Sequence, residues 1–467
     1  MRPTPPGDSP RGDKPAGDAW PVQPAGGRQQ PEVRPASILR NITWLGIGSA
    51  AVSPLWFLFI SFLCIRYLTA EAYGLMNSAL WLMVIAASLV DLGLNDFVTR
   101  EVARRRDQAW LYFSNFLVFR VVLGVVVVSA VLAIASSLGA GSERLSALLY
   151  AGVYALSVFL IGFCRVFFRA FQVLRYESIS VMLEKLLVLS GGTIMLFATR
   201  TATGTLLGMM VGMLIALLGT LWFVEFRIAP FEASVVSRSF VSKNLRIAAP
   251  LGVFAISVIA LTRMGPVILD FFEGSAAVGR FGAAYRIIEA MLLLPALATA
   301  ALLPKMASSW GSGHVTVYRE VVYKGVLWMA LVSGLLGGAL ALGGEMLMDW
   351  IVKDPLAYAG AGRTLQLLGL GYPFMCLNSV LSVALIASDG QSFLGRFMAS
   401  VTAATALLFV VAIWQFGTPG LVGVFVASSI GTTAALWLRF RVVMAGALPQ
   451  PSAEAPGDAP DAGEARG

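Results

Sequence analysis

The sequence predicts an all-α polytopic membrane protein with about twelve transmembrane helices, arranged as two six-helix lobes around a central cavity. Of its 467 residues, 57% are hydrophobic and 13% are charged. That charged fraction is about half the usual value for a soluble protein. Apolar runs of about 20 residues, the length that crosses a hydrocarbon core of about 30 Å, recur along the chain. In addition, the second half repeats features of the first half at a spacing of about 205 residues.

Both ends of the chain are predicted to be disordered cytoplasmic tails. Residues 1–36 are rich in Pro, Gly, Asp and Arg and have almost no aliphatic side chains. Residues 444–467 are rich in Pro, Ala and acidic residues from position 449 onward. Such segments bury too little apolar surface to fold. No short apolar region with a small-residue cleavage site precedes the first span, so we expect no cleavable signal peptide.

The apolar runs between these tails predict twelve spans. In chain order they cover residues 41–65, 75–94, 112–136, 146–168, 178–198, 203–224, 245–269, 281–303, 321–342, 364–387, 393–414 and 421–443. We therefore expect an N-terminal six-helix lobe at 37–225, a cytoplasmic linker at 226–244 and a C-terminal six-helix lobe at 245–443.

Basic residues in the loops predict the orientation. Eighteen Arg and Lys residues fall on one side of the twelve spans, and six fall on the other. The smaller set is Arg66, Arg144, Arg200, Arg280, Lys353 and Arg363. Cytoplasmic loops carry the excess of positive charge, so both termini are expected in the cytoplasm. The same bias explains the net charge of +8 without nucleic acid as a partner.

The internal repeat aligns the two halves in the same direction. Ala72 and Gly74 before the second span match Ala277 and Gly279 before the eighth, and Leu39 with Arg40 matches Leu245 with Arg246. Arg100 matches Lys305. Parallel repeats are related by an axis along the membrane normal, an arrangement known in transporters.

The chain offers little for a metal or another cofactor, so we expect neither. It has one histidine, His314, and three cysteines inside apolar runs, Cys64, Cys164 and Cys376. Buried thiols are the simplest interpretation of those cysteines.

Charged residues inside predicted spans are the first candidates for function, because each costs roughly 2.5 to 3.5 kcal/mol to insert. Arg286 and Glu289 lie three residues apart in the eighth span, where they can neutralise each other. The equivalent positions of the second span are Trp81 and Val84. The pair is therefore specific to the second half, and we expect it to face the bundle interior and contact cargo or a coupling ion.

Five further charges lie within spans. Arg120 in the third span, Arg165 in the fourth, Lys185 in the fifth and Arg263 in the seventh are candidates for a cationic cavity. Snorkelling to the membrane surface is the alternative for the arginines. Glu184 is a candidate for ion coupling or charge pairing. Because Glu184 and Lys185 are adjacent, they are expected to face different surfaces, and one of them is expected to pair with Arg120.

Two uncharged polar residues of the tenth span, Asn378 and Gln366, are candidates for contact with sugar hydroxyl groups. Ordinary hydrogen bonding between helices is the alternative.

Several short patterns in the sequence resemble a known family. The patterns are Gly279, Phe281, Ala283 to Arg286, Pro295 and Leu303 with Pro304, together with Tyr73 and Gly74, Asp91 to Gly93, residues 167–185, and Asp389 with Gly390. They resemble polysaccharide repeat-unit flippases of the O-antigen type, within the multidrug, oligosaccharidyl-lipid and polysaccharide exporter (MOP) superfamily. The resemblance covers about residues 37–443.

The resemblance implies a transporter in the bacterial cytoplasmic (inner) membrane that moves a polyprenyl-pyrophosphate-linked oligosaccharide to the periplasmic leaflet for cell-surface polysaccharide. It also implies polysaccharide polymerase and chain-length proteins as partners. One departure from the family pattern is that the seventh span has Arg263 to Pro266 where many members carry an acidic residue. An acidic coupling site in that span is therefore in doubt.

Other functions remain open at this point. A drug or cation exporter of the same superfamily would be expected to use buried acids more than arginines. A peptidoglycan-precursor flippase would be expected to have two further spans, and a twelve-span facilitator of the other large class would need a different motif after its second span. A membrane glycan polymerase or ligase would be expected to have a large periplasmic loop and a catalytic group, neither of which the sequence shows.

Overall fold

The computed structural model describes residues 55–447, apart from the side chains of residues 249–251 and 254, and every regular element in this range is a helix. The predicted tail at 1–36, most of the predicted first span, and residues 448–467 of the tail predicted at 444–467 lie outside the described residues. The longer helices are α3 (Ala70–Ser88), α5 (Ala109–Ser137), α6 (Ser142–Ala170), α7 (Leu174–Thr199), α8 (Ala202–Arg227), α9 (Arg238–Glu273), α10 (Ser275–Met291), α11 (Leu293–Gly311), α12 (Val315–Ile351), α13 (Ala361–Ala387) and α14 (Gln391–Ala447). Short elements are η1 (Phe59–Leu63), α2 (Cys64–Tyr67), α4 (Leu94–Arg104), η2 (Arg106–Gln108) and η3 (Ala233–Val235).

The helix content confirms the predicted all-α membrane class. Ten helical segments in the described range are long and apolar enough to cross a membrane. One of them, α14, consists of two helices that meet at Gly417, whose φ of 59° and ψ of −137° are not helical. A shorter apolar helix, Leu55–Tyr67, forms the end of the predicted first span. With α14 counted as two helices, the ten segments account for eleven of the predicted spans, and only the end of the first predicted span lies within the described residues.

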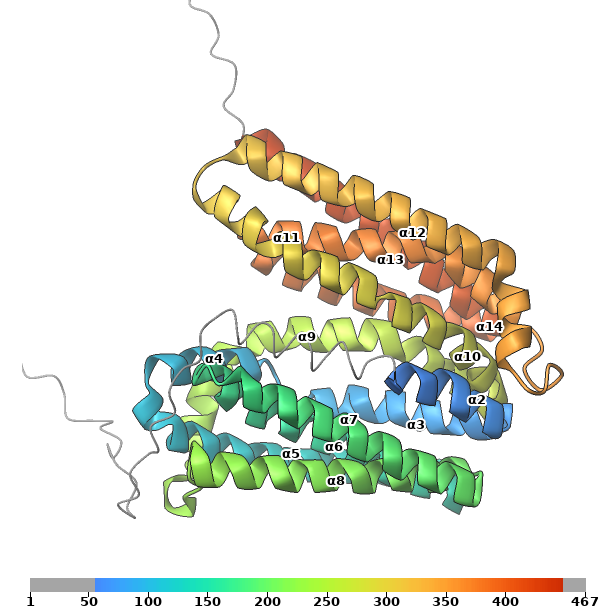
Figure 1. Cartoon of the computed structure of the whole chain (residues 1–467), viewed down its shortest axis with the longest axis horizontal. Helices are drawn as coiled ribbons and strands as arrows, with labels where there is room; N and C mark the ends of the chain where they lie inside the picture. The colour runs from blue at the N-terminus through green and yellow to red at the C-terminus, as the bar shows by residue number, and fades with distance from the viewer. Residues whose placement is uncertain (1–54, 448–467) are drawn as a thin grey trace, which may run out of the picture.

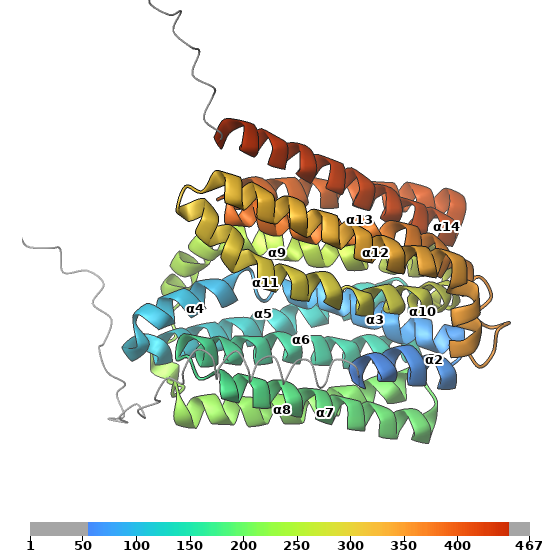
Figure 2. The same cartoon turned by 45° about the horizontal axis from the view of Figure 1, so that its top comes forward.

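The helices form two bundles (Figure 1). We call the helices up to α8 the N-terminal lobe and α9 to α14 the C-terminal lobe. The bundles meet at the end where α2, α3 and α10 lie, and they separate toward the end where α4 and the start of α9 lie (Figure 1). Figure 2 shows the same helices turned by 45°. α9 runs between them and packs against both α3 and α14.

The lobes are joined most closely where α3 crosses α10. A Cβ atom added at Gly74 would lie 1.6 Å from the carbonyl oxygen of Ser275, and one added at Gly279 would lie 1.8 Å from that of Ala70. Both contacts join residues of the two halves, and Ala70 and Gly74 correspond to Ser275 and Gly279 at the 205-residue spacing. Two small residues four positions apart on each helix allow the backbones to touch. The crossing therefore lies on the pseudo-twofold axis that the repeat predicts.

The basic turns gather at the end where the lobes separate. The turns between α6 and α7, α11 and α12, and α13 and α14 lie at the same end of the molecule as α4 and the start of α9 (Figure 1). Most members of the larger basic set lie at these helix ends.

The predicted eighth span consists of two helices, because the chain bends between α10 and α11. Pro295 has no N–H to donate to the carbonyl of Met291 four residues earlier. The hydroxyl of Tyr372 in α13 donates to that carbonyl instead, at 2.9 Å. The freed backbone acceptor is thus satisfied from a neighbouring helix.

Two predicted boundaries differ from the observed ones. α9 begins at Arg238, so it includes the second part of the predicted linker, because the side chain of Ser237 accepts a hydrogen bond from the backbone N–H of Phe240 and caps the helix. The segment is polar, so hydropathy alone does not detect it. At the other end, α14 continues past the predicted limit at residue 443 to Ala447.

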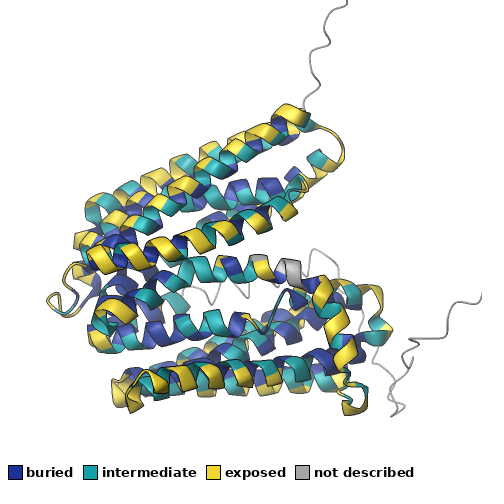
Figure 3. Ribbon diagram, turned by 180° about the vertical axis from the view of Figure 1, so that it is seen from behind, coloured by how far each residue is buried: buried dark blue, intermediate teal, exposed yellow. Residues whose placement is uncertain are grey.

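Burial follows the arrangement of the two lobes. Exposed residues cover the outward faces of the helices, and buried residues gather where the bundles meet (Figure 3). Large apolar side chains such as Leu335, Leu342 and Trp350 of α12 are more than two-thirds exposed. In a protein with this many apolar spans, such faces suit contact with lipid chains.

Candidate cationic site between the lobes

Arg286 of α10 is held by residues of the other lobe. Its Nη2 and Nε donate to Oδ1 of Asn77 in α3 at 2.7 and 3.2 Å. The amide nitrogen of Asn77 donates to the carbonyl of Tyr73 at 2.8 Å, which leaves Oδ1 facing the guanidinium group. The guanidinium carbon also lies 5.3 Å from the ring centre of Trp81. α3 therefore fixes the position of a charge that belongs to α10.

The carboxylate of Glu289 forms ion pairs with two arginines. Its Oε2 lies 2.6 Å from Nη1 of Arg286, the contact expected from their spacing of three residues, and its Oε1 lies 3.5 Å from Nη2 of Arg263 in α9. One carboxylate therefore faces two guanidinium groups, and the cluster of Arg263, Arg286 and Glu289 has a net charge of +1. We call this group the interlobe cluster.

The interlobe cluster is partly accessible. The side chain of Arg286 is 10% exposed, whereas those of Arg263 and Glu289 are 28% and 29% exposed. A group that approaches from the exposed side would meet Arg263 and Glu289 first and Arg286 behind them.

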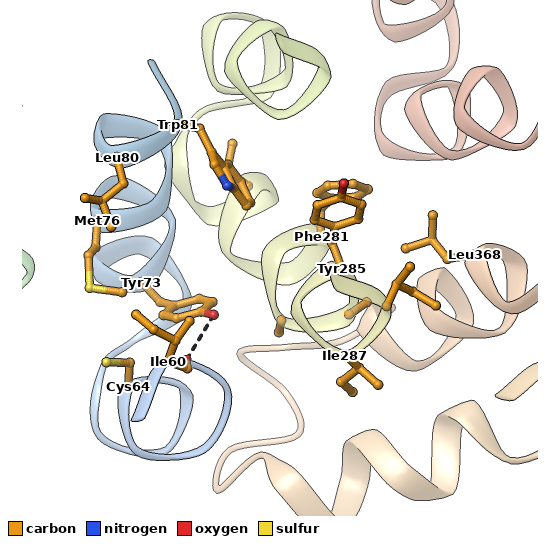
Figure 4. Close-up of a cluster of buried hydrophobic side chains, with 14 of the residues drawn as sticks. Ile60, Cys64, Tyr73, Met76, Leu80, Trp81, Phe281, Tyr285, Ile287 and Leu368 are labelled. Carbon is orange, nitrogen blue, oxygen red and sulfur yellow. Dashed lines mark hydrogen bonds between the residues drawn. The ribbon is translucent and has the colours of Figure 1, made fainter. Parts of the chain in front are cut away.

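Trp81, which lies against Arg286, belongs to a group of aromatic rings from α3 and α10. Trp81 and Tyr285 meet edge to face with their centres 6.2 Å apart, and Phe281 stacks on Tyr285 (Figure 4). The hydroxyl of Tyr73 donates to the carbonyl of Ile60 in the π-helical turn η1 at 3.2 Å (Figure 4). Trp81 is fully buried, and its indole N–H has no acceptor among the described residues.

A second cluster lies within the N-terminal lobe. Arg165 of α6 donates to Oε2 of Glu184 in α7 at 2.6 Å, and Nζ of Lys185 lies 3.1 Å from Oε1 of the same carboxylate. Glu184 is buried and Lys185 is 31% exposed, as expected for adjacent residues that face different surfaces, and the long lysine side chain reaches back to the carboxylate. Nζ of Lys185 also lies 4.8 Å from the ring centre of Trp56. This cluster also has two cations for one carboxylate.

Arg120 does not belong to either cluster. Its Nη2 donates to Oδ1 of Asp91 at 2.8 Å, and its guanidinium carbon lies 4.5 Å from the ring centre of Phe163. The expected pairing of Arg120 with Glu184 or Lys185 is therefore wrong, because Asp91, at the end of the second span, is nearer. Arg120 is fully buried, so in this conformation it neither snorkels nor contacts a ligand. Asp91 also accepts a hydrogen bond from the backbone N–H of Asn95, at the start of α4, at 3.2 Å.

The two uncharged candidates lie in α13. Asn378 donates to the carbonyl of Ser429 at 3.3 Å and accepts from the hydroxyl of Thr433 at 2.7 Å, so it joins α13 to α14. Gln366 packs beside Gly344 of α12. Contact of either residue with sugar stays a prediction.

Three residues that shape the charged sites were not among the candidates from the sequence: Asn77, Trp81 and Asp91. Asn77 was the hardest of the three to identify from the sequence, because a single amide on a helix usually takes part in helix packing. The repeat could have found Trp81, which occupies the position equivalent to Arg286 and lies against it. Within residues 55–447, Cys64, Cys164 and Cys376 are buried free thiols, and no group of three or more His, Cys, Asp or Glu side chains could hold a metal.

Family comparisons match this arrangement. The family described as polysaccharide biosynthesis protein matches residues 38–310, and the family described as MatE matches residues 267–414. No curated protein matches the chain.

Solved structures share the fold. A multidrug resistance MATE family transporter of the MOP superfamily in an inward-facing conformation has a TM-score of 0.69 at 15% identity, over 87% of this chain and 98% of that chain. The lipid II flippase MurJ in an inward closed conformation has a TM-score of 0.67 at 12% identity, over 87% and 90%. A MOP superfamily transporter from Pyrococcus furiosus, described as having a binding pocket of reverse polarity, has a TM-score of 0.59 at 15% identity, over 87% and 96%.

These similarities confirm the predicted fold of two lobes of six helices. The polysaccharide biosynthesis match covers more than half of the sequence and includes both α3 and α10. The chain therefore belongs to the polysaccharide biosynthesis protein family.

Proposed function

We propose that the protein flips a polyprenyl-pyrophosphate-linked oligosaccharide from the cytoplasmic to the periplasmic leaflet of the bacterial inner membrane, for synthesis of a cell-surface polysaccharide. The observation that carries this proposal is the interlobe cluster, in which Arg263 and Arg286 share the single carboxylate of Glu289. The excess positive charge lies among membrane-crossing helices. An unneutralised cation there costs free energy, so its presence indicates a functional site.

A pyrophosphate group suits this excess charge. Guanidinium groups have planar sets of donors that match phosphate oxygens, and charged hydrogen bonds of this kind are stronger than neutral ones. The glycan is hydrated and cannot cross hydrocarbon unaided, whereas the polyprenyl chain can remain in the bilayer.

A cation-coupled drug exporter of the same superfamily is the rival function. Such a protein needs an acid that can hold a cation, yet Glu289 is already bound to two arginines and Glu184 to Arg165 and Lys185. The partners of both acids favour an anionic cargo. The reverse polarity described for the binding pocket of the Pyrococcus furiosus transporter supports variation of pocket polarity among proteins of this fold.

Alternating access is the mechanism that we propose. The lobes separate at the end that carries most of the basic loops, so we infer a state open to the cytoplasm. The TM-score to the inward-facing MATE transporter, 0.69, is higher than the 0.58 to an outward-facing one, which supports this assignment. Cargo would enter between the lobes, bind the interlobe cluster and leave after the lobes rock. The second cluster, with Lys185 31% exposed, would offer another phosphate contact on the way.

The proposal is tested by exchanging one charge at a time. Purified protein in liposomes would be assayed for translocation of a fluorescent polyprenyl-pyrophosphate oligosaccharide. We expect Arg263→Gln to reduce the rate about 10-fold or more, because a hydrogen bond to a charged group contributes about 1.5 to 3 kcal/mol. Glu289→Gln should retain the rate within about 3-fold, since its amide oxygen still accepts from one arginine and the positive charge increases.

A matched control is Arg363→Gln, which removes an exposed arginine outside both clusters. If Arg263→Gln transports normally while Glu289→Gln is inactive, the anionic cargo is wrong and the exporter function gains support. Association with polymerase and chain-length proteins remains a prediction.

A further inference from the structure

A pocket of about 550 Å³ lies between the two lobes, at the end where they meet. One wall is the end of the first span, from Ile65 to Thr69, and the other is the connection between α12 and α13, from Lys353 to Tyr358. Figures 1 and 2 both place α2 beside this connection. The pocket is separate from the interlobe cluster, because none of Arg263, Arg286 and Glu289 lines it.

Each lobe contributes one cation to the pocket. Arg66 comes from α2 and Lys353 from the connection, and both are exposed. Neither has an ion-pair partner among the described residues. The single acid of the lining, Asp354, accepts hydrogen bonds from the backbone N–H groups of Leu356 and Ala357 at 3.1 and 3.2 Å. Its carboxylate therefore holds the loop in shape, and the lining keeps a net charge of +1.

The floor of the pocket joins the lobes. The hydroxyl of Tyr358 donates to the carbonyl of Leu68 at 3.3 Å, and its ring meets Tyr73 with centres 6.5 Å apart. Tyr358 is only 4% exposed. The pocket therefore has this shape only while the lobes touch at this end.

An apolar surface begins beside the pocket. Trp350 of α12 is 71% exposed and meets Phe62 with ring centres 5.9 Å apart, and Met346 one turn earlier is 77% exposed. Tryptophan and tyrosine near the end of a span mark the depth of lipid headgroups. Cations at headgroup depth next to an exposed apolar helix face match the two halves of an anionic lipid.

We propose that this pocket binds the phosphate of an anionic lipid, with Arg66 and Lys353 on the phosphate and the lipid chains along Trp350 and Met346. Such a lipid bridges the two lobes in the present conformation. Because a ligand stabilises the state that it binds, occupancy favours the closed contact at this end and opposes its opening. The site thus couples the composition of the outer leaflet to the conformational equilibrium. The inference does not depend on the identity of the cargo.

The test uses the full-length protein in nanodiscs of neutral phosphatidylcholine. Phosphatidylglycerol or polyprenyl phosphate is included in separate arms, and inorganic pyrophosphate is added in a third. We expect the phosphate lipid to raise the unfolding temperature of the unmodified protein by about 2 °C or more. The two lipid arms identify the source of the phosphate, and a shift with pyrophosphate alone would show that the headgroup suffices.

The double variant Arg66→Gln/Lys353→Gln should lose most of that shift, and Lys353→Gln alone, in an exposed connection, should lose part of it. Arg200→Gln is the matched control, because it removes another exposed arginine from the same set of loops and lies outside the lining. Arg263→Gln should keep the phosphatidylglycerol shift, which separates this site from the interlobe cluster. The inference is overturned if neither lipid shifts the unmodified protein, or if the double variant shifts as much as the unmodified protein does.

Discussion

Arg120 and Arg286 are both arginines within apolar helices, but their surroundings give them different roles. Arg120 is completely buried and has its own carboxylate, Asp91. Arg286 shares one carboxylate with a second arginine and lies behind two partly exposed side chains. A neutral buried pair stabilises a packed structure only while both partners remain, whereas an excess of charge at an accessible position is suited to a ligand.

We predict that Arg120→Ala reduces stability rather than substrate binding. Removal of the fully buried Arg120 leaves Asp91, whose side chain is 18% exposed, without its counter-ion, which should cost up to about 3 kcal/mol. The variant should show a lower midpoint of thermal unfolding in detergent, followed by tryptophan fluorescence. Arg263→Gln is the comparison and should unfold near the temperature of the unmodified protein. Equal unfolding temperatures for all three proteins would show that the Arg120–Asp91 pair is not structural.

The sequence predicted some of these residue roles and could not predict others. The contact between Arg286 and Glu289 follows from helical geometry, because residues three positions apart lie on one face. The partners of Arg120 and Arg263 come from other helices, and no periodicity within a helix specifies which helices will be neighbours. Asn77 lies more than 200 positions before Arg286, so only the fold brings them together.

At the scale of elements, the crossing of α3 and α10 is the contact on which the two-lobe arrangement depends. Gly74 and Gly279 each face a backbone carbonyl of the other helix, and backbone cannot move aside as a flexible side chain can. The spacing of small residues was visible in the sequence as part of the repeat. The sequence did not show that this spacing marks a helix crossing, because small residues also occur in loops and at flexible positions.

We predict that Gly74→Ala weakens the joint between the lobes. The added methyl group would overlap the carbonyl of Ser275, so α3 and α10 would have to move apart and lose packing. The unfolding temperature and the yield of folded protein should both fall. Gly219→Ala in α8 is the matched control, because nothing lies within 4 Å of its added methyl group and alanine favours a helix by about 1 kcal/mol. A Gly74→Ala protein as stable as the control would contradict the close crossing.

The bend between α10 and α11 was also encoded in the sequence. Pro295 within an apolar run of span length predicts a break, because it removes a backbone donor. The hydropathy of the run hides this break, since residues on both sides are apolar. The result is that α10, which carries Arg286 and Glu289, is a separate helix from α11.

At the scale of the molecule, the lobes are closed against each other at one end by specific contacts. Arg144 of α6 forms an ion pair with Asp270 of α9, and Ser275 donates to the same carboxylate at 2.9 Å. Nearby, the hydroxyl of Tyr358 in the C-terminal lobe donates a hydrogen bond to the carbonyl of Leu68 in the N-terminal lobe. In an alternating-access cycle, the Arg144–Asp270 and Tyr358–Leu68 contacts must separate when the protein opens at this end, whereas the Ser275 hydrogen bond lies within the C-terminal lobe.

We predict that a reversible link across this contact stops transport. In an Arg144→Cys/Asp270→Cys protein, a short bifunctional thiol reagent with a cleavable disulfide should block translocation, and reduction should restore it. The native cysteines are buried and should not react. Arg144→Cys alone, treated in the same way, controls for modification of a single thiol. Transport that continues in the linked protein would show that this end does not open.

The central claim is that this member of the polysaccharide biosynthesis protein family moves an anionic, lipid-linked glycan rather than a cationic drug. The most direct measurement compares the two cargoes with the same preparation of unmodified protein in liposomes. One assay follows translocation of a labelled polyprenyl-pyrophosphate oligosaccharide, and the other follows uptake of a fluorescent organic cation with and without a proton or sodium gradient. We predict translocation of the lipid-linked oligosaccharide and no gradient-dependent uptake of the cation. Uptake of the cation without translocation of the oligosaccharide would contradict the account.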